Sequence, residues 1–251
     1  MTSIETAVTV AALMFVSGGI GLFLQKRLAE HHTSERSRDM IGGVVGLITL
    51  LLALVLGLLI WTAYGVFNTQ QNELQTLCAK ALEFDLEMRQ YGPEAMHGRE
   101  LLRTDLVWAH EQFWGDEDAA NLAYAASYAN MDTMSSFLGG LQPATEAQRQ
   151  LLGDAKRNYG FIGEYRLLMS LQLTNPISWP LIIAVTAWSC LLFCGMGLLS
   201  RANATTLSAL ALGSCAVASA IFLILEFSQP YTSLIRISPA GLEEVIVDLD
   251  K

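Results

Sequence analysis

The sequence predicts an all-α membrane protein with four transmembrane helices in two hairpins and an intervening soluble helical bundle. Of its 251 residues, 52% are hydrophobic and only 16% are charged, and the mean hydropathy of +0.38 is unlike that of a soluble globule. The apolar residues gather in four long stretches, two on each side of a charged segment. About 20 apolar residues in a helix cross a bilayer, because a helix satisfies its own backbone polar groups in lipid.

The four apolar stretches are the expected membrane spans, and each is nearly free of ionisable residues. They cover about 4–24, 41–67, 177–199 and 205–227. A cleaved signal peptide is the alternative for the first, but no positive charge precedes it and its apolar core is too long. The expected domains are a first hairpin at 1–67, a soluble acidic helical bundle at 68–175, a second hairpin at 176–227, and an extended strap with a short acidic tail at 228–251.

Charge is distributed unevenly along the chain. The formal net charge is −9, and the segment 68–175 holds 15 acidic and 8 basic residues, so we expect no nucleic-acid partner. The short loops of the two hairpins are basic, with Lys26, Arg27, Arg36, Arg38 and Arg201. By the positive-inside bias these loops face the cytoplasm and the acidic segment faces outward. Cys78 is the one cysteine outside the spans, so no disulfide framework is predicted.

The second span is expected to continue into the acidic segment as one helix. Asp39 is the expected cap, and no stop signal follows until Tyr91-Gly92-Pro93. Beyond the span, apolar residues form a seam with a first step of seven and then alternating steps of three and four. They are Phe67, Leu74, Leu77, Ala81, Phe84, Met88 and Tyr91. Such a seam packs on partner helices. The sequence thus predicts a rod of about fifty residues, ~75 Å long.

Three further helices complete the expected four-helix bundle. The first follows Pro93 and ends at Gly115, and the second runs from Asp116 to Gly139-Gly140. The third begins at a capping box of Thr145 and Gln148. Its expected apolar face is Leu151, Leu152, Ala155, Tyr159, Ile162 and Leu167. After the fourth span, Gln229-Pro230 breaks the helix, and alternation from Tyr231 to Pro239 predicts an extended strap.

Four segments carry a resemblance to a known family. They are Gly42-Gly43-Val44-Val45-Gly46-Leu47, the rod at Asn68 to Leu77, His110-Glu111-Gln112-Phe113-Trp114, and the tail from Leu225 to Pro239 with its acidic residue, Pro-Tyr pair and Ser-Pro. With these the chain resembles the bestrophin-like domain family of bacterial four-span proteins. Ser228-Gln229 departs from the charged pair common there. The resemblance implies the inner membrane of a bacterium and a distant similarity to bestrophins, which are pentameric anion channels with a pore along the second span.

The candidate site is a narrow face of the second span with small and hydroxyl side chains. It comprises Gly42, Gly46, Thr49, Ala53, Gly57, Tyr64 and Asn68. In one interpretation Gly42 and Gly46 let helices pack closely. In the other, the face lines a pore whose apolar neighbours control wetting. Both interpretations require neighbouring copies, so we expect a homo-oligomer, with a pentamer implied by the resemblance.

Glu226, near the end of the fourth span, is expected to be an interfacial carboxylate paired with Arg236 or with a backbone amide of the strap. No metal, cofactor or catalytic motif is apparent, since the adjacent His31 and His32 lack chelating spacing. The expected partners are therefore the lipid bilayer, ions and further copies of the chain. The leading hypothesis is a homo-oligomeric ion channel lined by the second span. The alternative is a membrane-anchored sensor or scaffold whose bundle binds a partner without conducting ions.

Overall fold

The computed structural model describes residues 2–27, 35–115, 117–173 and 179–250, and every regular element within them is a helix. The chain divides into two compact units. The first unit is Met1–Val66 with Pro176–Ser228, and the second is Phe67–Asn175 with Gln229–Lys251. The all-α fold class is confirmed.

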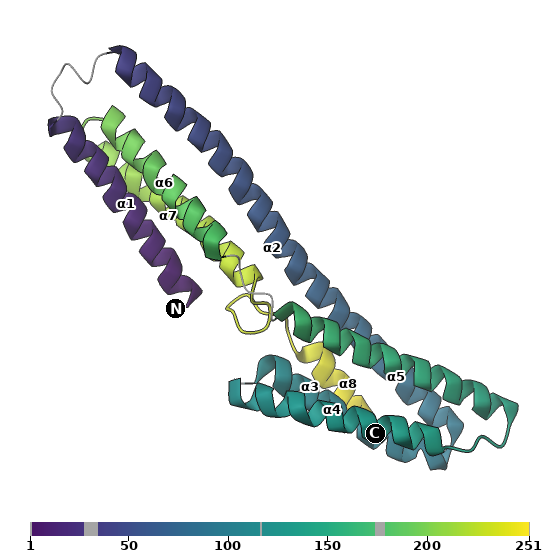
Figure 1. Cartoon of the computed structure of the whole chain (residues 1–251). Coiled ribbons are helices and arrows are strands. Elements are labelled where there is room, and N and C mark those ends of the chain that lie inside the picture. Colours follow the sequence, from purple (N-terminus) through teal and green to yellow (C-terminus); the bar gives the residue numbers. More distant parts are fainter. Residues whose placement is uncertain (1, 28–34, 116, 174–178, 251) are drawn as a thin grey trace. The chain divides into compact units, whose positions relative to one another are not determined.

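The first unit holds four helices that are long and apolar enough to cross a membrane. They are α1 (Ser3–Arg27), the N-terminal part of α2 (Glu35–Tyr91), α6 (Trp179–Leu199) and α7 (Ala204–Phe227). Helices α1, α6 and α7 lie side by side (Figure 1). Their shared core includes Met14, Val185 and Ile221, each with no exposed surface. The four predicted spans are therefore present as helices.

The start of α2 differs from the expectation. The helix begins at Glu35 rather than near residue 41, and Asp39, expected as its cap, lies inside it. One turn into the helix, Arg38 donates a hydrogen bond to the carbonyl of Leu199 at 2.9 Å. A guanidinium at the C-terminal end of α6 is favourable because it donates to a carbonyl that has no partner within the helix and lies at the negative end of the helix dipole. His31 and His32 lie outside the described residues.

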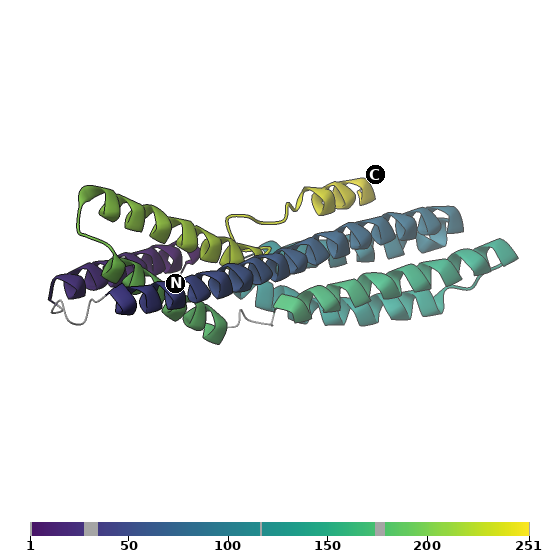
Figure 2. The same cartoon turned by 90° about the horizontal axis from the view of Figure 1, so that it is seen from above.

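Helix α2 is a single helix of 57 residues, as the sequence predicts (Figure 2). It ends where Gly92 takes a φ of 128°, a backbone conformation that residues with a side chain rarely adopt. Pro93 then opens a short 3-10 helix, η2 (Pro93–Ala95). The boundary between the two units falls within α2, between Val66 and Phe67.

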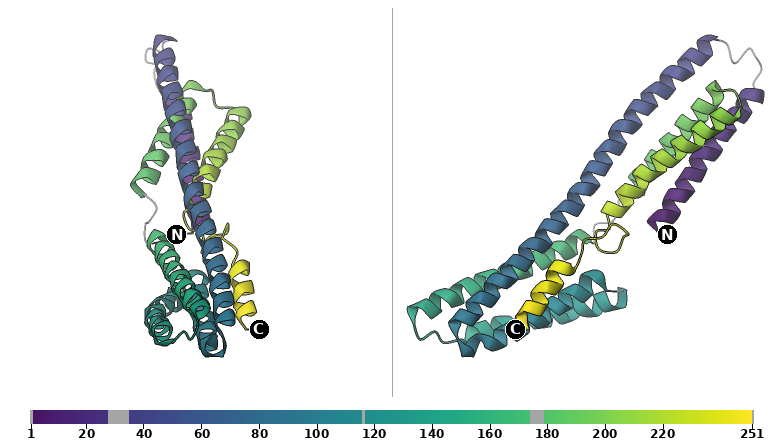
Figure 3. Two further views of the ribbon diagram at one scale, coloured as in Figure 1. Left: turned by 90° about the vertical axis from the view of Figure 1, so that its right-hand side faces the viewer. Right: turned by 180° about the vertical axis from the view of Figure 1, so that it is seen from behind.

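The second unit packs the rest of α2 with α3 (Met96–Trp114), α4 (Glu117–Gly140), α5 (Glu146–Leu173) and α8 (Ala240–Leu249). The predicted seam of α2 is buried from Leu74 to Tyr91, with Phe67 partly buried. Leu242, Val245 and Leu249 of α8 complete the same core. The expected four-helix bundle is therefore a five-helix unit in which α8 lies beside α2 and α3 (Figure 3).

Helix α5 begins as predicted and differs from the prediction at one core position. Gln148 N donates to Thr145 Oγ1 at 3.1 Å, and Thr145 N donates to Gln148 Oε1 at 3.3 Å. This reciprocal pair is a capping box. Leu167, expected in the core, is 45% exposed, because Arg166 and Met169 occupy the buried positions of that turn.

The segment after α7 folds into turns rather than an extended strap. Ile237 N donates to Pro230 O at 2.7 Å, which closes the segment on itself. The Tyr231 hydroxyl donates to Gln70 Oε1 at 2.7 Å, and Trp114 Nε1 donates to Ile237 O at 2.9 Å. The proline and the buried tyrosine thus fix a compact loop against α2 and α3.

Candidate functional site

The membrane part of α2 is far less covered by its own chain than the other spans are. In its most apolar stretch 6% of residues are buried, against 28 to 33% in α1, α6 and α7. Leu52 and Ala63 mark its one buried edge. Because each helical residue turns by about 100°, this edge is a single narrow seam. Most of the surface of this stretch therefore has no neighbour among the residues that the structure describes.

The predicted site residues lie beside this seam. Gly46, Thr49, Ala53, Gly57 and Tyr64 are exposed, and Gly42 is half-buried. Asn68 is also exposed and belongs to the second unit. On the other side of the seam α2 carries large apolar side chains, which are Leu47, Leu51, Leu54 and Leu58, all exposed. The helix thus separates a small-residue face from a leucine face.

The glycines of α2 do not make close helix contacts within the described chain. A Cβ placed at Gly42, Gly43, Gly46 or Gly57 would meet nothing within 4 Å. The close helix packing expected at Gly42 and Gly46 therefore has no partner helix among the described residues.

Close helix packing occurs instead between α1 and α6. A Cβ at Gly21 would lie 2.1 Å from the Cys194 carbonyl oxygen, and one at Gly197 would lie 2.2 Å from the Gly18 carbonyl oxygen. These glycines let two backbones touch. The sequence analysis missed them, although a small residue recurs on one face of each helix, at Gly18 and Gly21 and at Cys194 and Gly197.

The small-residue face carries few polar groups, and some are already engaged. Thr49 Oγ1 donates to Val45 O of its own helix at 2.8 Å. The Tyr64 ring meets the Phe227 ring edge-on, with 5.6 Å between centroids. The face carries no ionisable group besides the Tyr64 phenol. Chemically it can offer space and weak polar contacts, and it cannot bind an ion by charge.

Glu226 and Arg236 contrast in exposure. Glu226 is 2% exposed at the end of α7, whereas Arg236 is exposed in the loop after it. They belong to different units. Their pairing stays a prediction.

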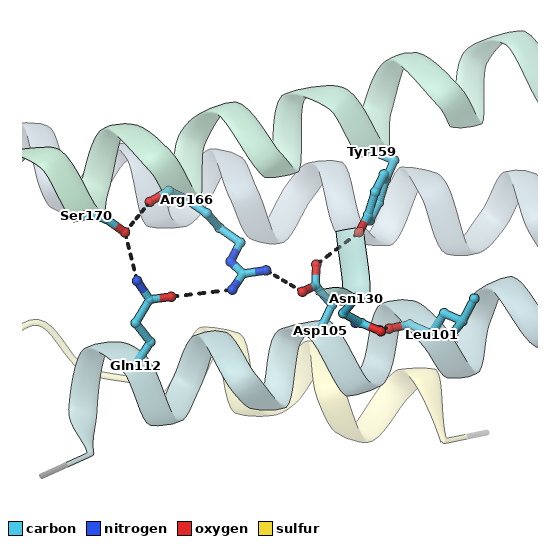
Figure 4. A network of polar contacts seen from close by, with 7 residues as sticks. All are labelled: Leu101, Asp105, Gln112, Asn130, Tyr159, Arg166 and Ser170. Atoms are coloured by element: carbon cyan, nitrogen blue, oxygen red, sulfur yellow. Dashed lines mark hydrogen bonds and ion pairs between the residues drawn. The ribbon is translucent and has the colours of Figure 1, made fainter. Parts of the chain in front are cut away.

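A buried polar network, which the sequence analysis did not identify, lies in the second unit (Figure 4). Arg166 of α5 pairs with Asp105 of α3, and their side chains are 4% and 1% exposed. The Tyr159 hydroxyl reaches the other Asp105 oxygen at 3.4 Å. Gln112 accepts from Arg166 at 3.5 Å and donates to Ser170 Oγ at 2.9 Å. Burial, and then the Asp105 charge, raise the Tyr159 pKa, so its hydroxyl stays protonated.

Arginines also hold the C-terminal end of α8. Arg99 pairs with the buried Asp85 and donates to the Leu249 carbonyl at 3.3 Å. Arg89 donates to the Asp248 carbonyl at 3.2 Å. Cations at a helix C-terminus are favourable because of the helix dipole. The sequence offers one signal for this contact, because the acidic Asp85 directly follows Phe84, a residue of the apolar seam.

The family model of the bestrophin-like domain matches residues 12–242. The chain belongs to the bestrophin-like family. This bestrophin-like protein is also similar to the crystal structure of a point mutant of a bacterial bestrophin homolog from Klebsiella pneumoniae, with a TM-score of 0.73 and 13% identity over 98% of this chain and 100% of that one. Two structures described as membrane proteins, each with one proline-to-alanine change, have TM-scores of 0.71 and 0.70, with 12% and 14% identity over 97% of both chains. No curated protein matches the chain.

Proposed function

We propose that this bestrophin-like protein assembles with copies of itself into a membrane ion channel in which α2 lines the pore, and that it is not an enzyme. The observation that carries the proposal is the membrane part of α2, which is little covered by the described residues and whose Gly42, Gly46 and Gly57 meet none of them closely. Lipid or a neighbouring copy can cover the leucine face of this helix. Small residues on a membrane helix favour close contact with another helix or space for a pore.

The two exposed faces of α2 support a ring. The small-residue face and the leucine face lie on either side of the buried edge at Leu52 and Ala63, so the small-residue face of each copy can turn toward a central axis while its leucine face meets a different surface of the next copy. Such a head-to-tail contact uses two different patches and closes into a ring when the rotation allows it. Thr49, Ala53 and Gly57 would then face the axis. Kinship with bestrophins favours five copies.

Ion selectivity depends on two opposing features. Kinship with bestrophins favours anions, whereas 15 acidic against 8 basic residues between 68 and 175 favour cations near a pore mouth. The α2 face has no acidic or basic side chain with which to select between them. We propose that its apolar and small side chains set a constriction whose wetting controls conduction.

A sensor or scaffold is the second candidate function. It is favoured by Leu82 and Leu86, which are 43% and 56% exposed on the part of α2 that belongs to the second unit. Apolar side chains exposed on neighbouring turns outside the spans offer a surface to a partner. In this alternative α2 copies would pack without an open pore.

Ion flux into liposomes separates the two functions. The purified oligomer is reconstituted, and flux is compared in KCl and in sodium gluconate so that anion and cation permeation are distinguished. Gly57→Trp is expected to block flux, because its side chain would fill the axis. Ala53→Ser is expected to raise flux, because a hydroxyl eases wetting of an apolar constriction. Size-exclusion chromatography checks that each variant keeps its oligomer.

Leu212→Trp is the matched control, since Leu212 is 73% exposed on α7. We expect it to leave flux unchanged. Wild-type liposomes that match empty ones across voltage, pH and calcium would overturn the channel proposal. Equal loss of assembly in Gly57→Trp and Ala53→Ser, with no change in flux per oligomer, would make the two positions contacts between copies rather than pore-lining residues.

We also propose that the hairpin loops face the cytoplasm of a bacterial inner membrane. The supporting observation is the basic bias of those loops. Cys78 is a poor reporter, because burial raises its thiol pKa to about 11. In a cysteine-free background, Gln142→Cys on the second unit is expected to react with an impermeant thiol reagent on intact cells, whereas Ala202→Cys is not. The reverse labelling would invert the topology.

A further inference from the structure

Glu87 of α2 is a carboxylate with one satisfied and one unsatisfied oxygen. Asn158 of α5 donates to Glu87 Oε1 at 2.8 Å. Oε2 is buried and has no hydrogen-bond partner among the described residues. An ionised carboxylate in this position loses hydration without a full set of donors. A protonated carboxyl carries no charge, so its burial costs less than burial of the carboxylate.

The charges near Glu87 also oppose its ionisation. Asp154 of α5 and Glu83 of α2 act on it as like charges, and Lys80 of α2 acts in the opposite direction. Lys80 already pairs with Glu83 at 2.7 Å, and Asp154 pairs with Arg157 at 2.7 Å. The nearby cations are thus engaged elsewhere. Asp154 of α5 therefore opposes the ionisation of Glu87 of α2 across the contact between the two helices.

We propose that Glu87 is a proton-operated contact between α2 and α5, which tightens when the carboxyl is protonated and loosens when it ionises. Residues of both helices share one core here, since the Phe84 and Tyr159 rings lie 5.9 Å apart. Because α2 also carries the proposed pore face, the contact would regulate ion flux by pH. The regulation of ion flux rests on the proposed function.

The direction of the pH dependence follows from the pKa of Glu87 in the folded and in the unfolded protein. Burial first, and then the Asp154 charge, raise the Glu87 pKa from 4.5 to about 7 in the folded protein. The folded state therefore holds this proton more tightly than the unfolded state. The stabilisation is fully present below about pH 4.5 and is lost as the pH rises through about 7. Mild alkali should loosen the contact, and mild acid should restore it.

The first test is the melting temperature of the purified full-length protein between about pH 5 and pH 8.5. Glu87→Gln keeps the acceptor for Asn158 and cannot ionise. We expect it to melt with the wild type near pH 5 and about 2–4 °C above it at pH 8.5. Glu164→Gln, the same change at an exposed position of α5, is the control and should follow the wild type at every pH. Parallel curves for Glu87→Gln and wild type would overturn the proposal.

Asp154→Asn provides a second variant for the same contact. Removing the like charge should lower the Glu87 pKa of the folded protein, so the pH at which the fall in stability ends should move downward. An unchanged midpoint would mean that the two carboxylates do not interact.

Measurements of ion flux test whether the protonation of Glu87 regulates conduction. Wild-type flux should change across the same pH interval, and flux through Glu87→Gln should not. A Glu87→Gln flux profile that matches wild type would overturn the regulation. If no variant conducts at any pH while the melting curves still diverge, the channel proposal fails and the proton-operated contact stands.

Discussion

The two units of this protein hold their helices together by different means. In the second unit, α3 is tied to α5 by the buried pair Asp105–Arg166 and to α2 by Asp85–Arg99. In the first unit, α1 and α6 meet at glycines whose backbones touch. Helix α2 takes part in both units, with a buried seam in the second and a largely uncovered surface in the first.

The difference follows from the surroundings in which each unit folds. In lipid there is no hydrophobic drive between helices, so close van der Waals packing of small residues carries association. Outside the spans, apolar burial drives packing, and buried charges are tolerated only when they are paired. The uncovered membrane part of α2 fits neither pattern within one chain. This contrast supports the proposal that its partners belong to other copies.

Breaking the buried pair of the second unit should have the largest effect. Asp105→Ala leaves Arg166 without its counter-charge in a site that is 4% exposed. We expect a loss of about 3–5 kcal/mol in the free energy of unfolding, measured by denaturation of the purified protein. Glu146→Ala removes one partner of an exposed pair with Arg149 and should cost less than about 1 kcal/mol.

A double variant checks the mechanism. Asp105→Leu combined with Arg166→Met replaces both charges by apolar groups and should be less destabilised than Asp105→Ala alone. If the double variant loses as much unfolding free energy as Asp105→Leu and Arg166→Met lose together when measured singly, the two side chains contribute independently. The pairing of their charges would then not be what stabilises the site.

Close packing in the first unit should be the next most sensitive feature. Gly197→Ala places a methyl group against the Gly18 carbonyl oxygen, which is backbone and cannot rotate away. We expect a loss of about 1–3 kcal/mol from overpacking. The readout is the melting temperature of the detergent-solubilised protein. An unchanged melting temperature would mean that α1 and α6 are not in backbone contact.

The helices were predictable from sequence because long apolar stretches and regular seams depend on local pattern. The continuous α2, the capping box at Thr145 and the stop at Gly92 all follow from such signals. The contacts that decide which helices meet were not predictable. Asp105 and Arg166 are 61 residues apart, and no periodicity pairs them. Glycines in α1 and α2 also look alike in sequence, although Gly18 and Gly21 of α1 lie against another helix and Gly46 of α2 does not.

The smallest expected effect has the opposite sign and tests the uncovered face of α2 directly. Gly43 is exposed, and a Cβ there would meet nothing within 4 Å. Alanine costs less backbone entropy in a helix than glycine, so Gly43→Ala should stabilise the protein by about 0.5–1 kcal/mol where no neighbour crowds it. A glycine-to-alanine substitution is thus expected to destabilise the protein at Gly197 of α6 and to stabilise it at Gly43 of α2. Melting temperature and size-exclusion chromatography, run on Gly43→Ala beside Gly197→Ala, measure both outcomes. If Gly43→Ala instead dissociates the oligomer, a backbone of another copy must lie against this face, and Gly43 would belong to the contact between copies rather than to an open axis.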